Sequence, residues 1–418
     1  MKVAIVGAGI IGVTTAWELA SDGHEVVVFD RRGAAAEESS FANAGVIAPG
    51  YVSPWGGPGT RGKLLRSLLA RHGAIQLRWP LAWRDMRWLA QWRRACKLET
   101  YLTNRGRLQR LALYSRSRLH AITEACELEY ECSGGLLVLM RSKREKKLMH
   151  AGLDVLRAAG TPFREVDADE ARKIEPALSA DTALAGALYL PEDDVANCRQ
   201  FAQLLKWEAE ALGAQFHFNC DLAPLRRSAP TELSLASGSE AHRFDAVVVC
   251  AGVASADLLR PLGLRLPLTP VHGHSISAQI REPLNAPRSA VIDERYKVAI
   301  SRLGLRVRVA GGAEIGGSLA TIDPEALKTL YKVLQDWFPG AVTLRSGVQQ
   351  WKGARPMLPD GPPVIGPSGV PGVWLNLGHG SSGWALSCGS ARVLADLMQG
   401  KDPGIDPEGL GLERLLPH

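Results

Sequence analysis

The sequence predicts an α/β protein, α+β overall, in which a mostly antiparallel domain is inserted into a parallel βαβ domain. Three observations predict this class. An apolar run at residues 2–6 breaks into a glycine pattern that opens a helix. Residues 265–320 change character, because short strand-like runs there alternate with turns. Residues 373–398 then return to a strand, a glycine turn and a helix.

The first thirty residues form a strand–turn–helix–strand unit that ends on a carboxylate, Asp30. Gly7 permits the tight turn that leaves the strand. Gly9 lets backbone approach a pyrophosphate, and Gly12 lets the helix pack closely on the strands. The pyrophosphate would lie at the helix N-terminus, and Asp30 would accept hydrogen bonds from a ribose. The unit therefore predicts a Rossmann-like dinucleotide site, but it leaves open whether the nucleotide is NAD or FAD.

Chain length, composition and cysteine content limit the possible domain number, membrane topology and cellular location. A chain of 418 residues with 46% hydrophobic content predicts two or three domains with substantial cores. No uninterrupted apolar run is long enough to span a membrane, and no basic region precedes the first strand, so we expect no membrane span and no cleaved signal peptide. The seven cysteines are scattered without a C-x-x-C pair. They predict no disulfide framework and no metal site, and they favour a cytoplasmic location.

The net charge of +6 is distributed unevenly. Residues 61–118 hold 13 arginines and two lysines against two acidic residues. Within this stretch Trp79, Trp83, Trp88 and Trp92 recur at mostly helical intervals. Two interpretations stay open: peripheral contact with an anionic membrane surface, or a tryptophan face packed on the core with the arginines in water. No motif for nucleic-acid binding accompanies the charge, so no nucleic-acid partner is expected.

Periodicity predicts the elements that follow. A loop rich in small residues covers 33–50, and such loops often press backbone against a ligand. Helical patterns cover 107–126, 142–160, 168–174, 199–212 and 324–337. Strand patterns cover 134–140, 186–190, 215–219, 244–250, 273–279, 297–301 and 305–310.

The last third contains a second strand–glycine–helix junction. The strand 373–377 runs into Gly378-His379-Gly380-Ser381-Ser382-Gly383, where a helix begins. Its N-terminus is a second place to stabilise negative charge. We therefore predict a discontinuous nucleotide domain over 1–60, 196–262 and 347–418, and a substrate/helical domain over 61–195 and 263–346.

Several motifs, taken in order, resemble the D-amino acid dehydrogenase family within the D-amino acid oxidase-like FAD-dependent oxidoreductases. They are GAGIIG at 7–12, SSFANAG at 39–45, APGYVSPW at 48–55, DERYKVAISR at 293–302, GARPMLPDG at 353–361 and LNLGHGSSGW at 375–384. The resemblance implies FAD as the cofactor. The cofactor-binding residues that we assign are Val3, Gly7, Gly9, Ile10, Ile11, Gly12, Asp30, Arg31, Ser39, Ser40, Asn43, Ala44, Gly45, Gly252, Gly378, His379, Gly380, Ser381, Ser382 and Gly383.

The resemblance also implies a catalytic set. Arg355 matches the arginine that holds the substrate carboxylate, and a guanidinium can do so bidentately. Tyr296 is a candidate for lining the pocket. His274 stands where relatives commonly carry a tyrosine, so it would alter substrate choice or pH dependence. For His379, a hydrogen bond to the cofactor and a structural role both stay open.

The implied reaction is oxidative deamination of a D-amino acid to a 2-oxo acid and ammonia, with hydride transfer from Cα to flavin N5. The electrons would pass to a quinone or another acceptor, and residues 61–118 would contact the inner face of the cell membrane. The alternative is a dehydrogenase or oxidase of secondary amines such as D-proline, hydroxyproline or sarcosine-like substrates. A nicotinamide-dependent dehydrogenase and a non-enzymatic flavoprotein are further hypotheses.

Overall fold

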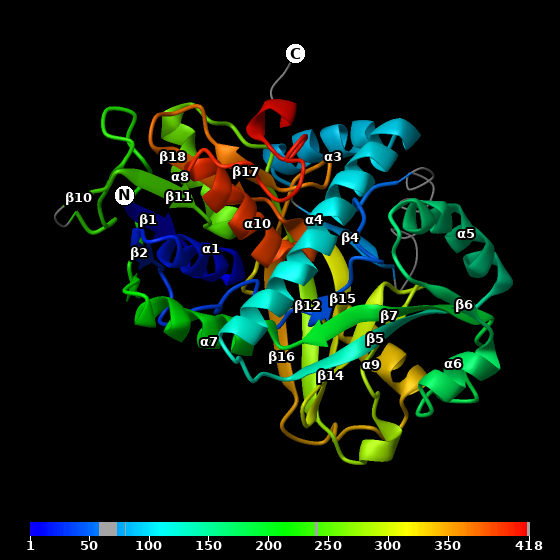
Figure 1. Ribbon diagram of the computed structural model, residues 1–418. Coiled ribbons are helices and arrows are strands. Elements are labelled where there is room, and N and C mark those ends of the chain that lie inside the picture. The colour runs from blue at the N-terminus through cyan, green and yellow to red at the C-terminus, as the bar shows by residue number, and fades with distance from the viewer. Residues whose placement is uncertain (58–72, 80, 239–240, 416–418) are drawn as a thin grey trace.

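The computed structural model describes residues 1–57, 73–79, 81–238 and 241–415. Its strands form two main sheets, a six-stranded sheet in the upper part of Figure 1 and a larger one below it. The smaller sheet is mostly parallel and the larger one mostly antiparallel, so the predicted α/β class, α+β overall, is confirmed.

The smaller sheet has the order β17-β18-β11-β1-β2-β8. Its strands pair in parallel, except that β17 is antiparallel to β18. The bounds are β1 Lys2–Val6, β2 Glu25–Phe29, β8 Gln215–His217, β11 Ala246–Val249, β17 Val364–Pro367 and β18 Val373–Leu377.

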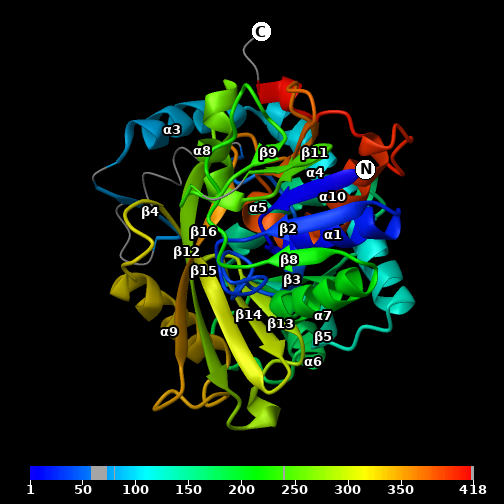
Figure 2. The ribbon, with the colours of Figure 1, turned by 90° about the vertical axis from the view of Figure 1, so that its left-hand side faces the viewer.

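Both faces of the smaller sheet are buried at its centre, because β1, β2 and β11 are apolar after their first residues. In β1, Val3 and Ile5 pack in one core, whereas Ala4 and Val6 pack in another on the opposite face. The first core is closed by helices, among which α1 lies against α10 and α7, and α10 lies against α4 (Figures 1 and 2). Their bounds are α1 Ile10–Ser21, α4 Leu98–Ala125, α7 Cys198–Ala211 and α10 Gly383–Met398.

The larger sheet has the order β16-β12-β15-β14-β13-β5-β7-β3, with β4 paired to β15 and β6 paired to β7. The bounds are β3 Val46–Ile47, β4 Ile75–Arg78, β5 Cys132–Met140, β6 Arg164–Val166, β7 Gly186–Ala196, β12 Thr269–Gln279, β13 Ala290–Asp293, β14 Val298–Leu303, β15 Arg306–Gly316 and β16 Gln349–Met357.

Helix α9, Pro324–Trp337, packs across β12, β14 and β15. Asp323 caps its N-terminus by accepting a hydrogen bond from the Glu325 amide, and Pro324 occupies the first helical position. The apolar spacing from Leu327 to Trp337 turns one face into the core. Local signals therefore suffice to place this helix, and its predicted bounds are confirmed.

The remaining elements connect or flank the sheets. They are α3 Trp83–Ala95, α5 Lys143–Ala158, α6 Ala168–Ile174, α8 Ser255–Leu259, β9 Glu232–Leu233, β10 His242–Arg243, and the 3-10 turns η1 Gly252–Ala254, η2 Arg260–Leu262, η3 Pro283–Asn285, η4 Gly380–Ser382 and η5 Leu412–Leu415.

Strand β16 was not predicted, because Gly353 and Pro356 favour a turn in the isolated sequence. It is an edge strand of the larger sheet, where a proline is tolerated. Strand β3 belongs to the same sheet. The larger sheet therefore includes strands from the segments 1–60 and 347–418, which we assigned to the nucleotide domain. The domain boundaries stay a prediction.

Candidate active site

One large cavity of about 1740 Å³ lies between the carboxyl ends of the parallel strands and the larger sheet. It brings together residues from both glycine junctions, from the loop at 39–45 and from the larger sheet. The predicted residues that line it are Gly7, Gly9, Ile10, Ile11, Asp30, Arg31, Ser39, Ser40, Asn43, Ala44, Gly45, Gly252, His274, Tyr296, Arg355, Gly378, His379, Gly380, Ser381, Ser382 and Gly383.

Two predicted residues do not line the cavity. Val3 lies within β1, fully buried between β2 and β11, so its side chain is a core residue. Gly12 lies in the first turn of α1, where a Cβ atom would overlap the carbonyl oxygen of Gly7. Gly12 therefore allows the helix to approach the strand, as the sequence predicts, and this places the helix N-terminus at the cavity.

The first end of the cavity is formed by the opening βαβ unit. Gly7 has a φ of +105°, and a Cβ atom there would lie 2.7 Å from the carbonyl oxygen of Cys250. Asp30 accepts hydrogen bonds from the amides of Ala8 (2.6 Å) and Arg32 (2.7 Å). Burial raises the pKa of Asp30. Arg31 borders the cavity but donates to Glu38.

The loop at 39–45 joins the two sheets. Ser40 Oγ accepts a hydrogen bond from the Ile10 amide at 3.1 Å, and Ser39 Oγ donates to the carbonyl of Ala354. At its other end, Ser301 Oγ donates to the carbonyl of Ala44 at 2.6 Å. Both ends of the loop are therefore fixed, one to helix α1 and the other to the larger sheet.

The second glycine junction opens helix α10. No side chain in the described part of the chain caps the first turn of α10, and the residues of this turn line the cavity. His379 is buried, and its Nε2 atom lies 3.0 Å from Ser390 Oγ in the same helix. Burial lowers the pKa of His379 to about 3, so the ring is neutral at physiological pH. These contacts favour the structural interpretation of His379.

Arg355 lies on β16 and reaches the cavity wall at the larger sheet. Its Nη1 atom donates to the carbonyl of Gly312 at 2.7 Å. A Cβ atom at Gly273 would overlap the guanidinium, so the glycine makes room for it. Arg355 forms no ion pair with any carboxylate in the part of the chain that the structure describes. Burial lowers its pKa to about 10, and the group stays charged at neutral pH.

His274 is buried on β12 and lines the same end of the cavity. Its Nε2 atom accepts a hydrogen bond from the Asp323 amide at 3.4 Å, which places the proton of the neutral ring on Nδ1. Burial lowers the pKa of His274 to about 4. Tyr296 lies nearby, and the Arg141 guanidinium lies 5.2 Å from its ring centroid.

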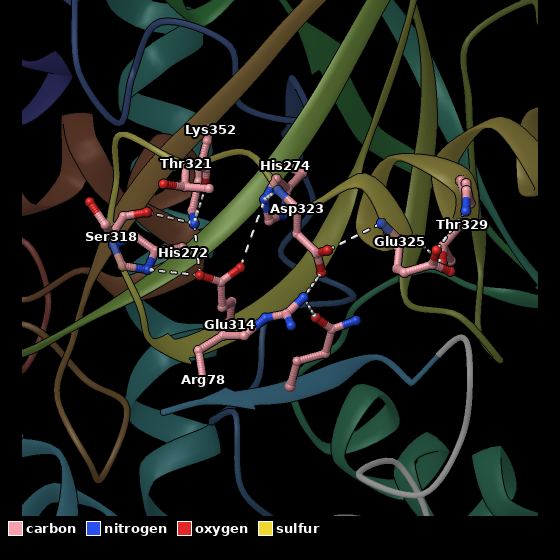
Figure 3. A network of polar contacts seen from close by, with 12 residues as sticks. Arg78, His272, His274, Glu314, Ser318, Thr321, Asp323, Glu325, Thr329 and Lys352 are labelled. Atoms are coloured by element: carbon pink, nitrogen blue, oxygen red, sulfur yellow. Dashed lines mark hydrogen bonds and ion pairs between the residues drawn. The ribbon is translucent and has the colours of Figure 1, made fainter. Parts of the chain in front are cut away.

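A polar network that the sequence did not predict lies behind His274 (Figure 3). Lys352 on β16 donates to Glu314 on β15 at 2.7 Å and to the carbonyls of Ser318 and Thr321 at 2.8 Å. These bonds hold the segment that carries the Asp323 amide against the sheet. Glu314 and Lys352 lie in strands where most adjacent residues are buried. Charged residues at such positions are usually paired, and this rule is the signal that could have indicated the network.

Comparisons with known proteins agree with this geometry. Residues 2–397 match the family described as FAD dependent oxidoreductase. The chain belongs to this FAD-dependent oxidoreductase family. The family resemblance predicted from the sequence is confirmed, and the chain is accordingly an FAD-dependent oxidoreductase.

Individual relatives cover nearly the whole chain. It is 44% identical over 416 residues to a D-amino acid dehydrogenase of Cereibacter sphaeroides, covering 99% of this chain and 95% of the relative. It is 41% identical over 419 residues to a D-amino acid dehydrogenase of Bradyrhizobium diazoefficiens, covering 99% of both chains. The fold is similar to that of glycine oxidase from Geobacillus kaustophilus, with a TM-score of 0.78, 23% identity and coverage of 100% and 99%.

The residues present fit the FAD that the family uses. Gly9 has only Ser40 Oγ near the position of a Cβ atom, at 3.6 Å, so backbone at the cavity stays accessible to a phosphate. Ser40 Oγ accepts from the Ile10 amide, and no other described side chain caps the first turn of α1, so the amides that follow could donate to a pyrophosphate. Asp30 would hold the ribose, and the loop at 39–45 with the α10 N-terminus would hold the remainder. The nicotinamide hypothesis is thereby set aside.

The tryptophan-rich stretch separates into two parts. Trp88 and Trp92 are buried, in agreement with a core role, but Trp79 and Trp83 are 79% and 78% exposed. Residues 61–72 of the predicted membrane contact lie outside the described part. In the ranges that are described, no helix is long and apolar enough to cross a membrane.

Proposed function

We propose that this enzyme oxidises D-amino acids to 2-oxo acids and ammonia. The observation that carries the proposal is Arg355, a cavity-facing guanidinium with no carboxylate partner among the described residues. A partly buried cation without a carboxylate partner is costly, and a carboxylate-bearing substrate would compensate it. Two relatives that carry the name D-amino acid dehydrogenase, at 44% and 41% identity, support the choice of stereochemistry.

The residues of the chain would act by binding and orientation. Arg355 would hold the substrate carboxylate bidentately and so direct the Cα–H bond. FAD, when bound, supplies the acceptor for the hydride that leaves Cα. The amine must be neutral for this step, so the substrate ammonium would release its proton to solvent before it enters the cavity, and the neutral ring of His274 adds no charge beside it. No side-chain base is required.

His274 and Tyr296 would shape the pocket around the substrate side chain. Both line the cavity at the end where Arg355 lies. Because the Asp323 amide occupies Nε2, His274 presents Nδ1–H as a hydrogen-bond donor. This donor replaces the tyrosine hydroxyl expected from the family resemblance, and it would set a preference among side chains.

A reduction assay with the purified holoenzyme tests the proposal. D- and L-amino acids are added without oxygen, and the visible absorbance of the flavin is followed. We expect bleaching by D-amino acids and not by their L-enantiomers. Bleaching by cyclic or N-methyl amines alone would establish the secondary-amine alternative instead. Bound flavin that no amine reduces would contradict both and indicate a non-enzymatic flavoprotein.

We infer that the electrons leave to a quinone, and that the surface around α3 contacts the membrane that holds it. Trp79 and Trp83 are exposed beside Arg84 and Arg87, a combination suited to an anionic lipid interface. Turnover with a soluble quinone analogue, compared with oxygen consumption, tests the acceptor. A rate with oxygen that equals the rate with quinone would contradict it.

A further inference from the structure

A second buried arginine, Arg308, lies behind the loop at 39–45. It is located on β15 and is 7% exposed. Its Nε atom donates to Ser277 Oγ at 3.0 Å and its Nη1 atom donates to the Asn43 carbonyl at 3.2 Å. No described carboxylate forms an ion pair with Arg308. Burial lowers its pKa to about 10, so it remains charged at neutral pH.

The nearest arginine on the same strand has the opposite arrangement. Arg306 has a side chain that is 41% exposed, and it pairs with Glu131 at 3.1 Å. Glu131 also accepts a hydrogen bond from Asn197 at 2.7 Å. The carboxylate near this part of the sheet is therefore engaged by Arg306, and Arg308 keeps an uncompensated charge. Such a charge costs stability, and this cost suggests that the charge serves a function.

Arg308 acts on a peptide that borders the cavity. In a trans peptide the N–H group points opposite to the carbonyl. The Asn43 carbonyl points to Arg308, which does not line the cavity, so the Ala44 amide points the other way. Ala44 lines the cavity, and its N–H group has no acceptor among the described residues. The guanidinium thus polarises a free donor that faces the cofactor site.

We propose that Arg308 raises the reduction potential of the bound FAD. Reduction by two electrons and one proton leaves a negative charge on the flavin ring. A fixed cation and an oriented amide, both shielded from water, stabilise that charge more strongly than the neutral oxidised form. Arg308 is a positioning residue in this respect, because it acts through the Asn43–Ala44 peptide. The proposal rests on FAD in the cavity and not on the identity of the amino acid.

The midpoint potential of the holoenzyme, measured against reference dyes during chemical reduction, tests the proposal without any amino acid. Arg308→Gln should lower the potential. A tenfold loss of preference for the reduced cofactor corresponds to about 30 mV for a two-electron couple. Arg306→Gln removes the same charge from the same strand at an exposed, paired position, and it should leave the potential unchanged. Arg308→Lys should recover most of the wild-type value.

A second variant keeps the test valid if Arg308→Gln fails to fold or to retain FAD. Ser277→Asp leaves Arg308 in place but supplies the carboxylate that it lacks, and it should also lower the potential. Ser277→Asn is the neutral control and should stay near wild type. A wild-type potential in flavin-loaded Arg308→Gln or Ser277→Asp would overturn the proposal, as would an equal decrease in Arg306→Gln.

Discussion

Two regions of the molecule use arginines that are partly or fully buried in opposite ways. At the seam of α1, α4 and α10, Arg118 and Arg392 both bind Glu18, whose side chain is fully buried. In the cavity wall and directly behind it, Arg355 and Arg308 donate to carbonyl and hydroxyl groups, and neither pairs with a described carboxylate. The paired arginines join helices that are far apart in the sequence. The unpaired ones hold a charge that an anion at the cavity would neutralise.

The difference suggests how to separate structural from functional charges in this fold. Removing the Glu18 carboxylate leaves Arg118 without a carboxylate among the described residues, whereas Arg392 keeps Asp22 and Asp396, so it should reduce stability. Removing an unpaired cavity arginine eliminates an existing cost, so it should reduce function and affect folding less. The following predictions test this contrast.

The largest effect is expected for Glu18→Gln. Arg118 donates to Glu18 at 2.6 and 2.8 Å, and Arg392 donates at 2.9 Å. Removing the buried carboxylate should lower the free energy of unfolding by about 3–5 kcal/mol. Denaturant titration measures it. Glu25→Gln, at an exposed pair with Lys2, is the control and should cost less than about 1 kcal/mol. Similar losses in both variants would contradict the assignment of Glu18.

Arg355→Ala should weaken transition-state binding of the substrate carboxylate by about 2–5 kcal/mol, seen as a loss in kcat/KM. FAD content should be unchanged, and the free energy of unfolding should fall less than in Glu18→Gln. Steady-state kinetics with D-alanine and denaturant titration measure the two quantities. A kcat/KM near the wild-type value would refute the role of Arg355. A loss of stability as large as that of Glu18→Gln would contradict the proposed difference between the arginines at Glu18 and those near the cavity.

Buried neutral histidines should make the cavity region sensitive to acid. The folded pKa of His274 is about 4, below the value near 6.5 in the unfolded chain. The unfolded chain therefore binds more protons between these values, and stability is lost as the pH falls from 6.5 to 4. At pH 5 the loss from this one residue is about 2 kcal/mol.

Unfolding titrations at pH 7 and pH 5 measure this difference. His274→Asn should reduce the change in the free energy of unfolding between the two pH values, whereas exposed His242→Asn should not. An unaltered pH dependence in His274→Asn would show that His274 does not titrate as its burial requires.

The smallest effects are expected for exposed arginines on α3 that do not line the cavity. Neutralising Arg84, Arg87, Arg93 and Arg94 on α3 should weaken binding to anionic liposomes by at most about 1 kcal/mol per charge. The free energy of unfolding should hardly change. Arg260→Gln, exposed on another surface, is the control. Binding that is absent, or equal in all variants, would exclude the membrane contact.

The sequence alone determined the elements whose signals are local. The opening βαβ unit follows from glycines and apolar runs within thirty residues, and α6, α9 and β18 have the predicted bounds. It also determined the family, because the motifs and their order identify it without coordinates. Caps, turns and periodicity act over a few residues, so their energies can be read along the chain.

Only the tertiary structure decided which charges are compensated. Glu18 meets Arg118 and Arg392 across 100 and 374 residues of sequence. Strand β16, which carries Arg355, exists because its edge position in the larger sheet accommodates Pro356. Arg306 and Arg308 are two residues apart, yet one pairs with Glu131 and the other is buried without a carboxylate. Pairing of this kind depends on distant segments that packing brings together, and no local pattern records it.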